Sequence, residues 1–223
     1  MTTQYPQRTV LLAGSSGLVG RKILQLLLDD SSVVKIHLLS RSPLQFQHPK
    51  IQVHLVDFKA LPTLPQIDEL YLAIGTTMKT AGSQAAFRAV DLDTNLAVAK
   101  AAKHAGARRV GLVSAAGADE HSTIFYNKVK GELEQALKQL NFETLVIARP
   151  SLLLDSRNGL GQPVRLGERL AIPLAKLLAP LLPASYKPVY AQAVAKSLTN
   201  TTPKSSGIVI LNSKQLVEMG REA

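Results

Sequence analysis

An apolar run meets three glycines in the sequence V-L-L-A-G-S-S-G-L-V-G, residues 10–20, and an amphipathic segment follows over Arg21 to Leu28. This order predicts a strand, a tight turn and a helix. In that geometry, backbone N–H groups and a helix N-terminus point at an anion, usually the pyrophosphate of a dinucleotide. We therefore expect a dinucleotide-binding turn near the start of the chain. The alternative is a glycine-rich turn that binds nothing.

The three glycines of this turn follow the pattern G-x-x-G-x-x-G, and each has a separate expected role. Gly14 permits the sharp exit from the strand, Gly17 lets the backbone approach the phosphates, and Gly20 lets the helix pack closely on the sheet. The residues of the turn that we expect to contact the cofactor are Gly14, Ser16, Gly17, Leu18, Val19 and Gly20.

Length and composition indicate one globular domain, because the chain has 223 residues and 46% of them are apolar. Cysteine is absent, which excludes a disulfide, a thiolate metal site and a cysteine nucleophile, and fits a reducing cytoplasm. Five scattered histidines show no metal-ligand spacing, so no metal site is expected. We see no signal peptide and no run of the roughly 18 apolar residues that a spanning helix needs. The prediction is a cytoplasmic protein without a transmembrane segment.

The net charge is +10, from 26 basic and 16 acidic residues. A basic surface attracts nucleic acid, acidic membranes or phosphorylated ligands. Here the basic residues are dispersed, and aromatic residues make up only 4% of the chain. No nucleic-acid binding is expected, and the charge is interpreted as a solvated basic surface.

Strands and helices alternate through the first two-thirds of the chain, which predicts an α/β fold with a doubly wound parallel sheet of Rossmann type. The expected strands are Thr9–Ala13, Val33–Leu39, Ile51–Val56, Glu69–Ile74, Arg109–Val113, Thr144–Ala148 and Ile208–Leu211. The expected helices are Leu18–Leu28, Gln84–His104 and Ser122–Leu140. We expect a single domain over residues 1–223, in which residues 151–206 add short helices as a small C-terminal cap on the substrate side.

Polar or small residues follow the apolar strands of this predicted sheet. Because ligands of open α/β sheets bind at the carboxyl ends of the strands, these residues are expected to gather at one binding edge. They are Ser40, Asp57, Gly75, Thr76, Ser114 and Pro150.

The residues after the second strand favour NADP over NAD. An NAD site usually has an acidic residue about twenty positions after the glycines, and here that position holds Ser40, followed by Arg41. Arg41 can bind a 2′-phosphate through charge-assisted hydrogen bonds, and Ser40 can donate another. The alternative is that Arg41 is a solvated loop residue. Asp57 is expected either to accept a hydrogen bond from the adenine amino group or to cap a turn.

Tyr126 and Lys130 are four residues apart in a predicted helix, and Ser114 ends the strand before it. The spacing puts Tyr126 and Lys130 on one face. This set suits carbonyl reduction: Tyr126 donates a proton to the developing alkoxide, Lys130 favours the phenolate and holds the nicotinamide ribose, and Ser114 polarises the carbonyl. The cofactor supplies the hydride. The alternative is that Tyr126 only packs and Lys130 is a solvated charge.

With these residues and the amino-terminal glycines, the sequence resembles the short-chain dehydrogenase/reductase superfamily in its extended or atypical branch. More narrowly, it resembles the Tat-interacting-protein-like oxidoreductases. The motifs that carry this resemblance are L-A-I-G-T-T at 72–77, S-A-A-G-A-D at 114–119, Y-N-K-V-K-G-E at 126–132 and A-R-P at 148–150. It implies an NADP-binding domain in which Gly75, Thr76 and Thr77 lie against the cofactor and Pro150 lies near the nicotinamide.

Two functions stay open at this point. One is an NADP-dependent oxidoreductase acting on a small carbonyl or alcohol substrate, as a monomer or homodimer. The other is an NADP-binding redox sensor or regulator that acts through a protein partner, as some relatives are described. The apolar residues 166–182 allow three interpretations: a helix over the active-site edge, a dimer surface, or shallow membrane contact.

Overall fold

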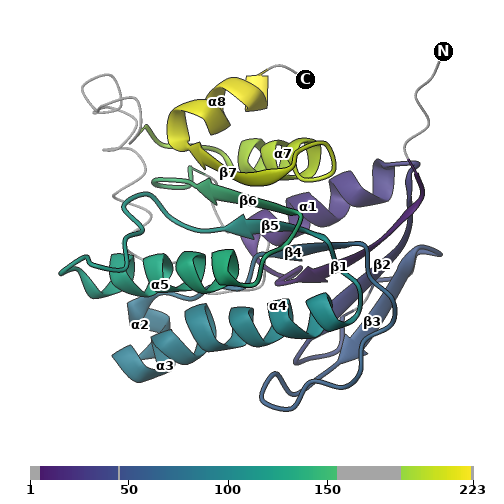
Figure 1. Cartoon of the computed structure of the whole chain (residues 1–223), viewed down its shortest axis with the longest axis horizontal. Coiled ribbons are helices and arrows are strands. Elements are labelled where there is room, and N and C mark those ends of the chain that lie inside the picture. The colour runs from purple at the N-terminus through teal and green to yellow at the C-terminus, as the bar shows by residue number, and fades with distance from the viewer. Residues whose placement is uncertain (1–5, 45, 155–186, 222–223) are drawn as a thin grey trace.

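A computed structural model describes residues 6–44, 46–154 and 187–221 of the chain (Figure 1). Its seven strands form one parallel sheet in the order β3-β2-β1-β4-β5-β6-β7. This confirms the predicted doubly wound parallel sheet. The strands are β1 (Arg8–Ala13), β2 (Val33–Ser40), β3 (Ile51–Leu55), β4 (Glu69–Leu72), β5 (Arg109–Val113), β6 (Thr144–Arg149) and β7 (Gly207–Asn212).

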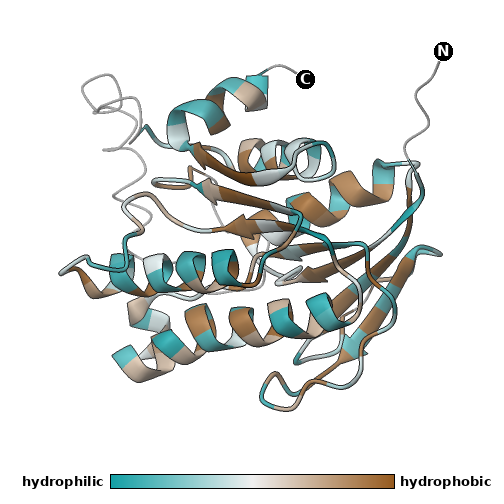
Figure 2. Ribbon diagram, in the orientation of Figure 1, coloured by the Kyte–Doolittle hydropathy of each residue, from teal (hydrophilic) through white to brown (hydrophobic). Residues whose placement is uncertain are grey.

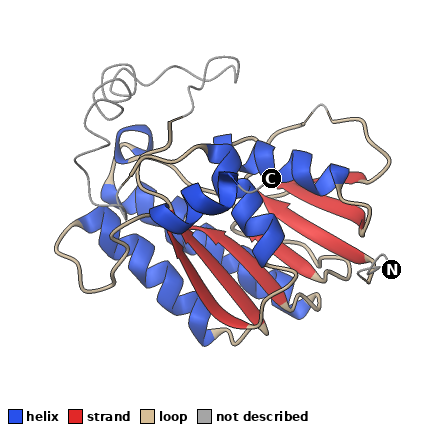
Figure 3. Ribbon diagram, turned by 90° about the horizontal axis from the view of Figure 1, so that it is seen from above, coloured by secondary structure: helices blue, strands red, loops and turns tan. Residues whose placement is uncertain are grey.

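Helices cover both faces of the sheet, as the view from above shows (Figure 3). On one face lie α1 (Leu18–Asp29), α7 (Ala191–Thr201) and α8 (Ser213–Arg221). On the other lie α3 (Gln84–Arg88), the π-helical segment η1 (Ala89–Thr94), α4 (Asn95–His104) and α5 (Phe125–Gln139), and a short helix α2 (Met78–Ala81) follows β4.

Two apolar cores form between the sheet and these helical layers. The interiors of the central strands are mostly apolar and buried, and the helices turn their apolar faces towards them (Figure 2). Val10 and Leu12 of β1 face the layer of α1 and α7, whereas Leu11 and Ala13 face the layer of α4 and α5. A strand covered on both faces has to be apolar at successive positions, which explains the continuous run at the start of the motif.

Several details differ from the sequence prediction: helix α2 was not predicted, and the strand expected over Glu69–Ile74 ends at Leu72. The helix expected over residues 84–104 contains a π-helical segment, and the helix expected from residue 122 begins at Phe125. Helix α7, inside the region expected to form a cap, packs on the sheet beside α1. Helix α8 was not predicted, although Asn212 and Gln215 form a reciprocal capping box at its start. The apolar 166–182 segment lies outside the described residues.

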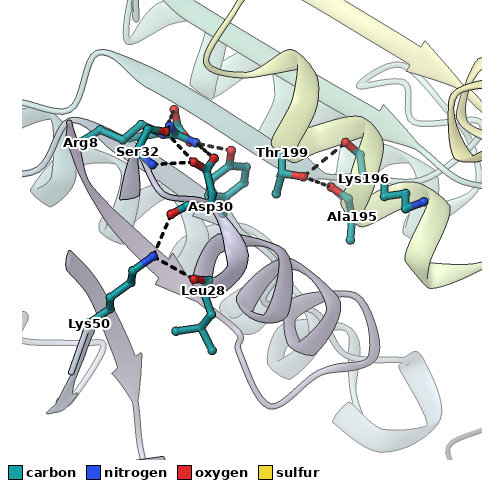
Figure 4. Close-up of polar contacts among 10 residues, drawn as sticks. Arg8, Leu28, Asp30, Ser32, Lys50, Ala195, Lys196 and Thr199 are labelled. Atoms are coloured by element: carbon teal, nitrogen blue, oxygen red, sulfur yellow. Dashed lines mark hydrogen bonds and ion pairs between the residues drawn. The ribbon is translucent and has the colours of Figure 1, made fainter. Parts of the chain in front are cut away.

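A buried polar network occupies the amino-terminal edge of the sheet, opposite the expected binding edge. Arg8 of β1 forms ion pairs with Asp30, at 2.8 Å, and with Glu69, at 3.4 Å, and it donates a hydrogen bond to Ser32 (Figure 4). The Tyr71 hydroxyl donates to the Glu69 carboxylate at 2.6 Å. Burial raises the pKa of Glu69, whereas the guanidinium of Arg8 opposes that rise. The network therefore depends on a cation next to a fully buried carboxylate.

Two histidines on neighbouring strands also form a polar contact inside the fold. His37 Nδ1 and His54 Nε2 lie 2.8 Å apart, and His37 is buried. Burial, together with His54 and Lys35, lowers the pKa of His37 to about 4. One ring nitrogen has to donate and the other to accept, so the contact is lost when both rings are protonated.

This pair is expected to make the fold acid-sensitive. Between about pH 6.5 and 4 the unfolded chain binds a proton at residue 37 that the folded chain does not, so stability falls as the pH drops through this window. In urea unfolding, we expect His37→Leu to remove about 1–3 kcal/mol of the stability difference between pH 7 and pH 4.5. The control is His121→Leu at an exposed histidine. Equal pH dependence in wild type and His37→Leu would contradict this role.

Candidate functional site

The switch in strand order lies between β1 and β4, and the glycine turn sits at their carboxyl ends. Gly14 has a φ of 94°, and a Cβ there would lie 2.4 Å from the backbone carbon of Ala73. Only glycine fits this left-handed position against the neighbouring strand. The turn is therefore held at the place where open α/β sheets bind their ligands.

The start of α1 has glycine at the two positions, Gly17 and Gly20, that lie against the turn. A Cβ at Gly20 would lie 2.0 Å from the Gly14 carbonyl oxygen, so only glycine lets the helix pack this closely on the turn. Gly17 is the N-cap residue and has no side chain to cap the first N–H groups of the helix. Ser16 is exposed beside it. These observations fit a bound pyrophosphate.

The ends of β2 and β3 contain the residues expected at the adenosine end. Ser40 is half-buried, and its hydroxyl exchanges hydrogen bonds with the backbone of Ser42. Arg41 is exposed at the same edge. Asp57 accepts a hydrogen bond from the Lys59 N–H at 2.9 Å, which is the contact of a turn cap. The structure thus brings Arg41 to the binding edge and shows the turn-cap contact for Asp57.

The segment after β4 lies beside buried charges. A Cβ added at Gly75 would lie 3.4 Å from Asp91 Oδ1 and 3.8 Å from Lys130 Nζ, so this glycine lies directly against the buried pair. The Thr76 N–H donates to Asp91 Oδ2 at 2.8 Å. The Thr77 hydroxyl caps α2 by accepting the Thr80 N–H.

Helix α5 carries the two residues expected to act in catalysis. Tyr126 is half-buried, and its ring centroid lies 5.5 Å from that of Phe87. The Lys130 side chain is 6% exposed, and its ammonium lies 2.7 Å from Asp91 Oδ1. Packing therefore fixes the tyrosine ring, and a buried carboxylate holds the lysine.

Ser114 has a partner that the sequence analysis missed. Its hydroxyl donates to Glu134 Oε1 at 2.5 Å, and Glu134 also accepts hydrogen bonds from Arg149 of β6. The hydrogen bonds that Arg149 donates to Glu134 raise the pKa of Arg149, which keeps its guanidinium charged. Glu134 follows Lys130 by four residues, so the spacing that pairs Tyr126 with Lys130 could also have identified it.

Asp91 is the other residue that sequence reasoning missed, and its side chain is fully buried. It lies on the π-helical segment η1, and π-helical turns occur often at functional sites. Asn95 ties η1 to the loop after β4, because its Nδ2 donates to the carbonyl oxygens of Ile74 and Asp91 at 3.2 and 3.1 Å. No sequence spacing connects Asp91 to Lys130, since the two lie on different helices.

Pro150 follows β6 at the same edge of the sheet, where its carbonyl oxygen accepts the Ala116 N–H. Within residues 6–44, 46–154 and 187–221, no group of three or more His, Asp or Glu side chains is placed to bind a metal ion. None of the helices in these ranges has the length and apolar character to traverse a bilayer.

This fold and edge define an NAD(P)-binding protein with a Rossmann fold. The model of a family described as NAD(P)H-binding matches residues 14–171. The chain belongs to this family.

Known proteins of similar sequence and structure agree with this class. Protein HTATIP2 of Rattus norvegicus is 30% identical over 97% of this chain and 90% of its own. Protein FMP52 of Coccidioides immitis, named mitochondrial, is 36% identical over 67% of each chain. An oxidoreductase of the short-chain dehydrogenase/reductase family from Burkholderia thailandensis matches with a TM-score of 0.65 and 16% identity, over 94% of this chain and 93% of its own. The cytoplasmic location stays a prediction.

Proposed function

We propose that this chain is an NADP-dependent oxidoreductase that transfers hydride between the nicotinamide and a small carbonyl or alcohol substrate. The placement of Lys130 carries the proposal. Its ammonium is buried at the binding edge, next to Gly75 and one helical turn from Tyr126. A solvated surface lysine would not be enclosed in this way.

The cofactor is assigned to residues along the whole edge. The pyrophosphate lies on the start of α1, and Ser40 with Arg41 binds the 2′-phosphate, which favours NADP over NAD. Asp57 accepts from the adenine amino group through the oxygen that does not cap the turn. Gly75, Thr76, Thr77, Lys130 and Pro150 lie at the nicotinamide end.

Proton transfer is assigned to Tyr126. When bound, the nicotinamide supplies or accepts the hydride. The Tyr126 hydroxyl gives its proton to the substrate oxygen in reduction, and its phenolate takes a proton from the alcohol in oxidation. The Lys130 ammonium stabilises the phenolate and holds a ribose hydroxyl. Ser114 polarises the carbonyl, which requires its hydroxyl to rotate away from Glu134.

One observation favours a second function, that of a cofactor-binding sensor acting through a protein partner. The hydroxyl of Ser114 donates a hydrogen bond to Glu134, and the ammonium of Lys130 forms an ion pair with Asp91. Both groups that would act on a substrate thus have partners within the chain. A sensor needs the cofactor cradle but no turnover.

Measuring NADPH binding and NADPH oxidation separately distinguishes these functions. Binding is measured by calorimetry, and oxidation is followed at 340 nm with a panel of aldehydes and ketones. Binding with turnover is the expected result for the oxidoreductase. Binding without turnover across the panel supports the sensor, and absence of binding contradicts both.

Arg41→Ala is expected to weaken NADPH binding about 10- to 100-fold, because charge-assisted hydrogen bonds to the 2′-phosphate are lost. NADH affinity should change less than about threefold, since NADH lacks that phosphate. Thermal shift and calorimetry measure both. Arg108→Ala removes an equal charge from an exposed position and serves as the control. Tighter binding of NADH than NADPH by wild type would contradict the role of Arg41.

A further inference from the structure

We propose that Asp91 is a positioning residue that holds the Lys130 ammonium and the Gly75–Thr76 backbone in the arrangement required by the nicotinamide half of the cofactor. The inference rests on the proposed function, because it assigns the nicotinamide ribose to Lys130. It adds a residue on a different helix that acts through Lys130 and does not itself touch the substrate.

Asp91 and Lys130 form a buried pair of opposite charges. The side chains of Asp91 and Lys130 are 0% and 6% exposed, and their charged atoms are 2.7 Å apart. A buried ammonium without a counter-ion is costly, and the carboxylate of Asp91 offsets part of that cost for Lys130. Asp91 therefore allows Lys130 to be buried at the binding edge in the ligand-free protein.

Asp91 also binds the loop after β4. Asp91 Oδ1 faces Lys130, and Oδ2 accepts the Thr76 N–H at 2.8 Å. One carboxylate thus joins α5 to the segment that follows β4. Gly75 lies against this junction, since a Cβ there would be 3.4 Å from Asp91 Oδ1 and 3.8 Å from Lys130 Nζ.

The backbone that carries Asp91 is also tied to the loop after β4. Asn95 donates to the carbonyl oxygens of both Asp91 and Ile74, so η1 is tied to the same loop that Asp91 contacts. Asp91 of η1 and Asn95 of α4 both contact residues 74–76. The π-helical segment η1 therefore places Asp91 beside this loop.

The test compares Asp91→Asn with Asp93→Asn, an exposed control two residues further on. Asparagine keeps an acceptor for the Thr76 N–H but removes the charge that holds Lys130. We expect NADPH binding to weaken about 10- to 100-fold in Asp91→Asn. Adenosine 2′,5′-bisphosphate, which lacks the nicotinamide half, should bind within about twofold of wild type, whereas a general structural role would weaken both ligands.

The second measurement is a double-mutant cycle on the ligand-free chain with Lys130→Met. Asp91→Asn should lower the unfolding midpoint, and adding Lys130→Met should restore at least half of the loss, because no unpaired charge is then buried. This also covers the case in which Asp91→Asn alone does not fold. A double variant that does not fold, or effects that simply add, would overturn the role.

The two proposals fail in different ways. If wild type binds no NADPH, the proposed function is wrong. If wild type binds NADPH and Asp91→Asn binds it equally well, only the positioning role of Asp91 is overturned.

Discussion

Replacing Tyr126 with Phe is expected to lower the turnover number for a carbonyl substrate by about 10²- to 10⁴-fold, the usual contribution of a general acid. The change removes one hydroxyl and keeps the ring that packs against Phe87. NADPH affinity should therefore stay within about twofold of wild type, and the unfolding midpoint should not move. Steady-state NADPH oxidation and calorimetry measure these quantities on the same preparation.

A matched pair of lysine variants on the same helix controls for this result. Lys130→Met should lower both turnover and NADPH affinity, because it removes the ammonium beside Tyr126 and the expected ribose contact. Lys128→Met changes an exposed lysine two residues earlier and should change neither. Turnover of Tyr126→Phe equal to wild type would show that another group transfers the proton, and the assignment of Tyr126 would then be wrong.

The fold was predictable because short stretches of the sequence determine its strands, turns and helices. Residues 10–20 combine a strand that must be apolar on both faces with a turn in which side chains would clash at Gly14 and Gly20. Most of the remaining strands are apolar runs followed by polar residues, and the helices after β1, β4, β5 and β6 are typical of a parallel sheet. The position of α7 was not predictable, since an amphipathic helix can equally cover a sheet face or a substrate pocket.

The site was predictable only where its residues share one element or one strand end. Tyr126 and Lys130 share a helix face, and Gly75 follows strand β4. Asp91 has no such signal, because its contact with Lys130 depends on the packing of α5 against η1 and on a π-helical turn that residue spacing does not specify. Glu134 carries the spacing signal, but a carboxylate at that position is equally typical of a solvated helix face.

Arg8→Met is expected to destabilise the fold by about 3–5 kcal/mol at pH 7, as is typical when one partner of a buried ion pair is removed. Glu69 is 0% exposed, and Arg8 is the cation beside it at 3.4 Å. Burial already raises the pKa of Glu69, and loss of the guanidinium raises it further, so the folded variant takes up a proton more readily than the unfolded chain. The loss of stability should therefore be smaller near pH 5 than near pH 8.

Urea unfolding of Arg8→Met, Glu69→Gln and the double variant separates lost packing from an unpaired charge. Glutamine still accepts the Tyr71 hydrogen bond and carries no charge, so the double variant should be more stable than Arg8→Met alone. The network lies at the amino-terminal edge of the sheet, whereas the cofactor site lies at the carboxyl edge, so NADPH affinity of the folded variants should equal that of wild type. If the double variant loses as much stability as the single changes added together, the buried charge is not the cause of the loss, and Arg8 contributes through its packing.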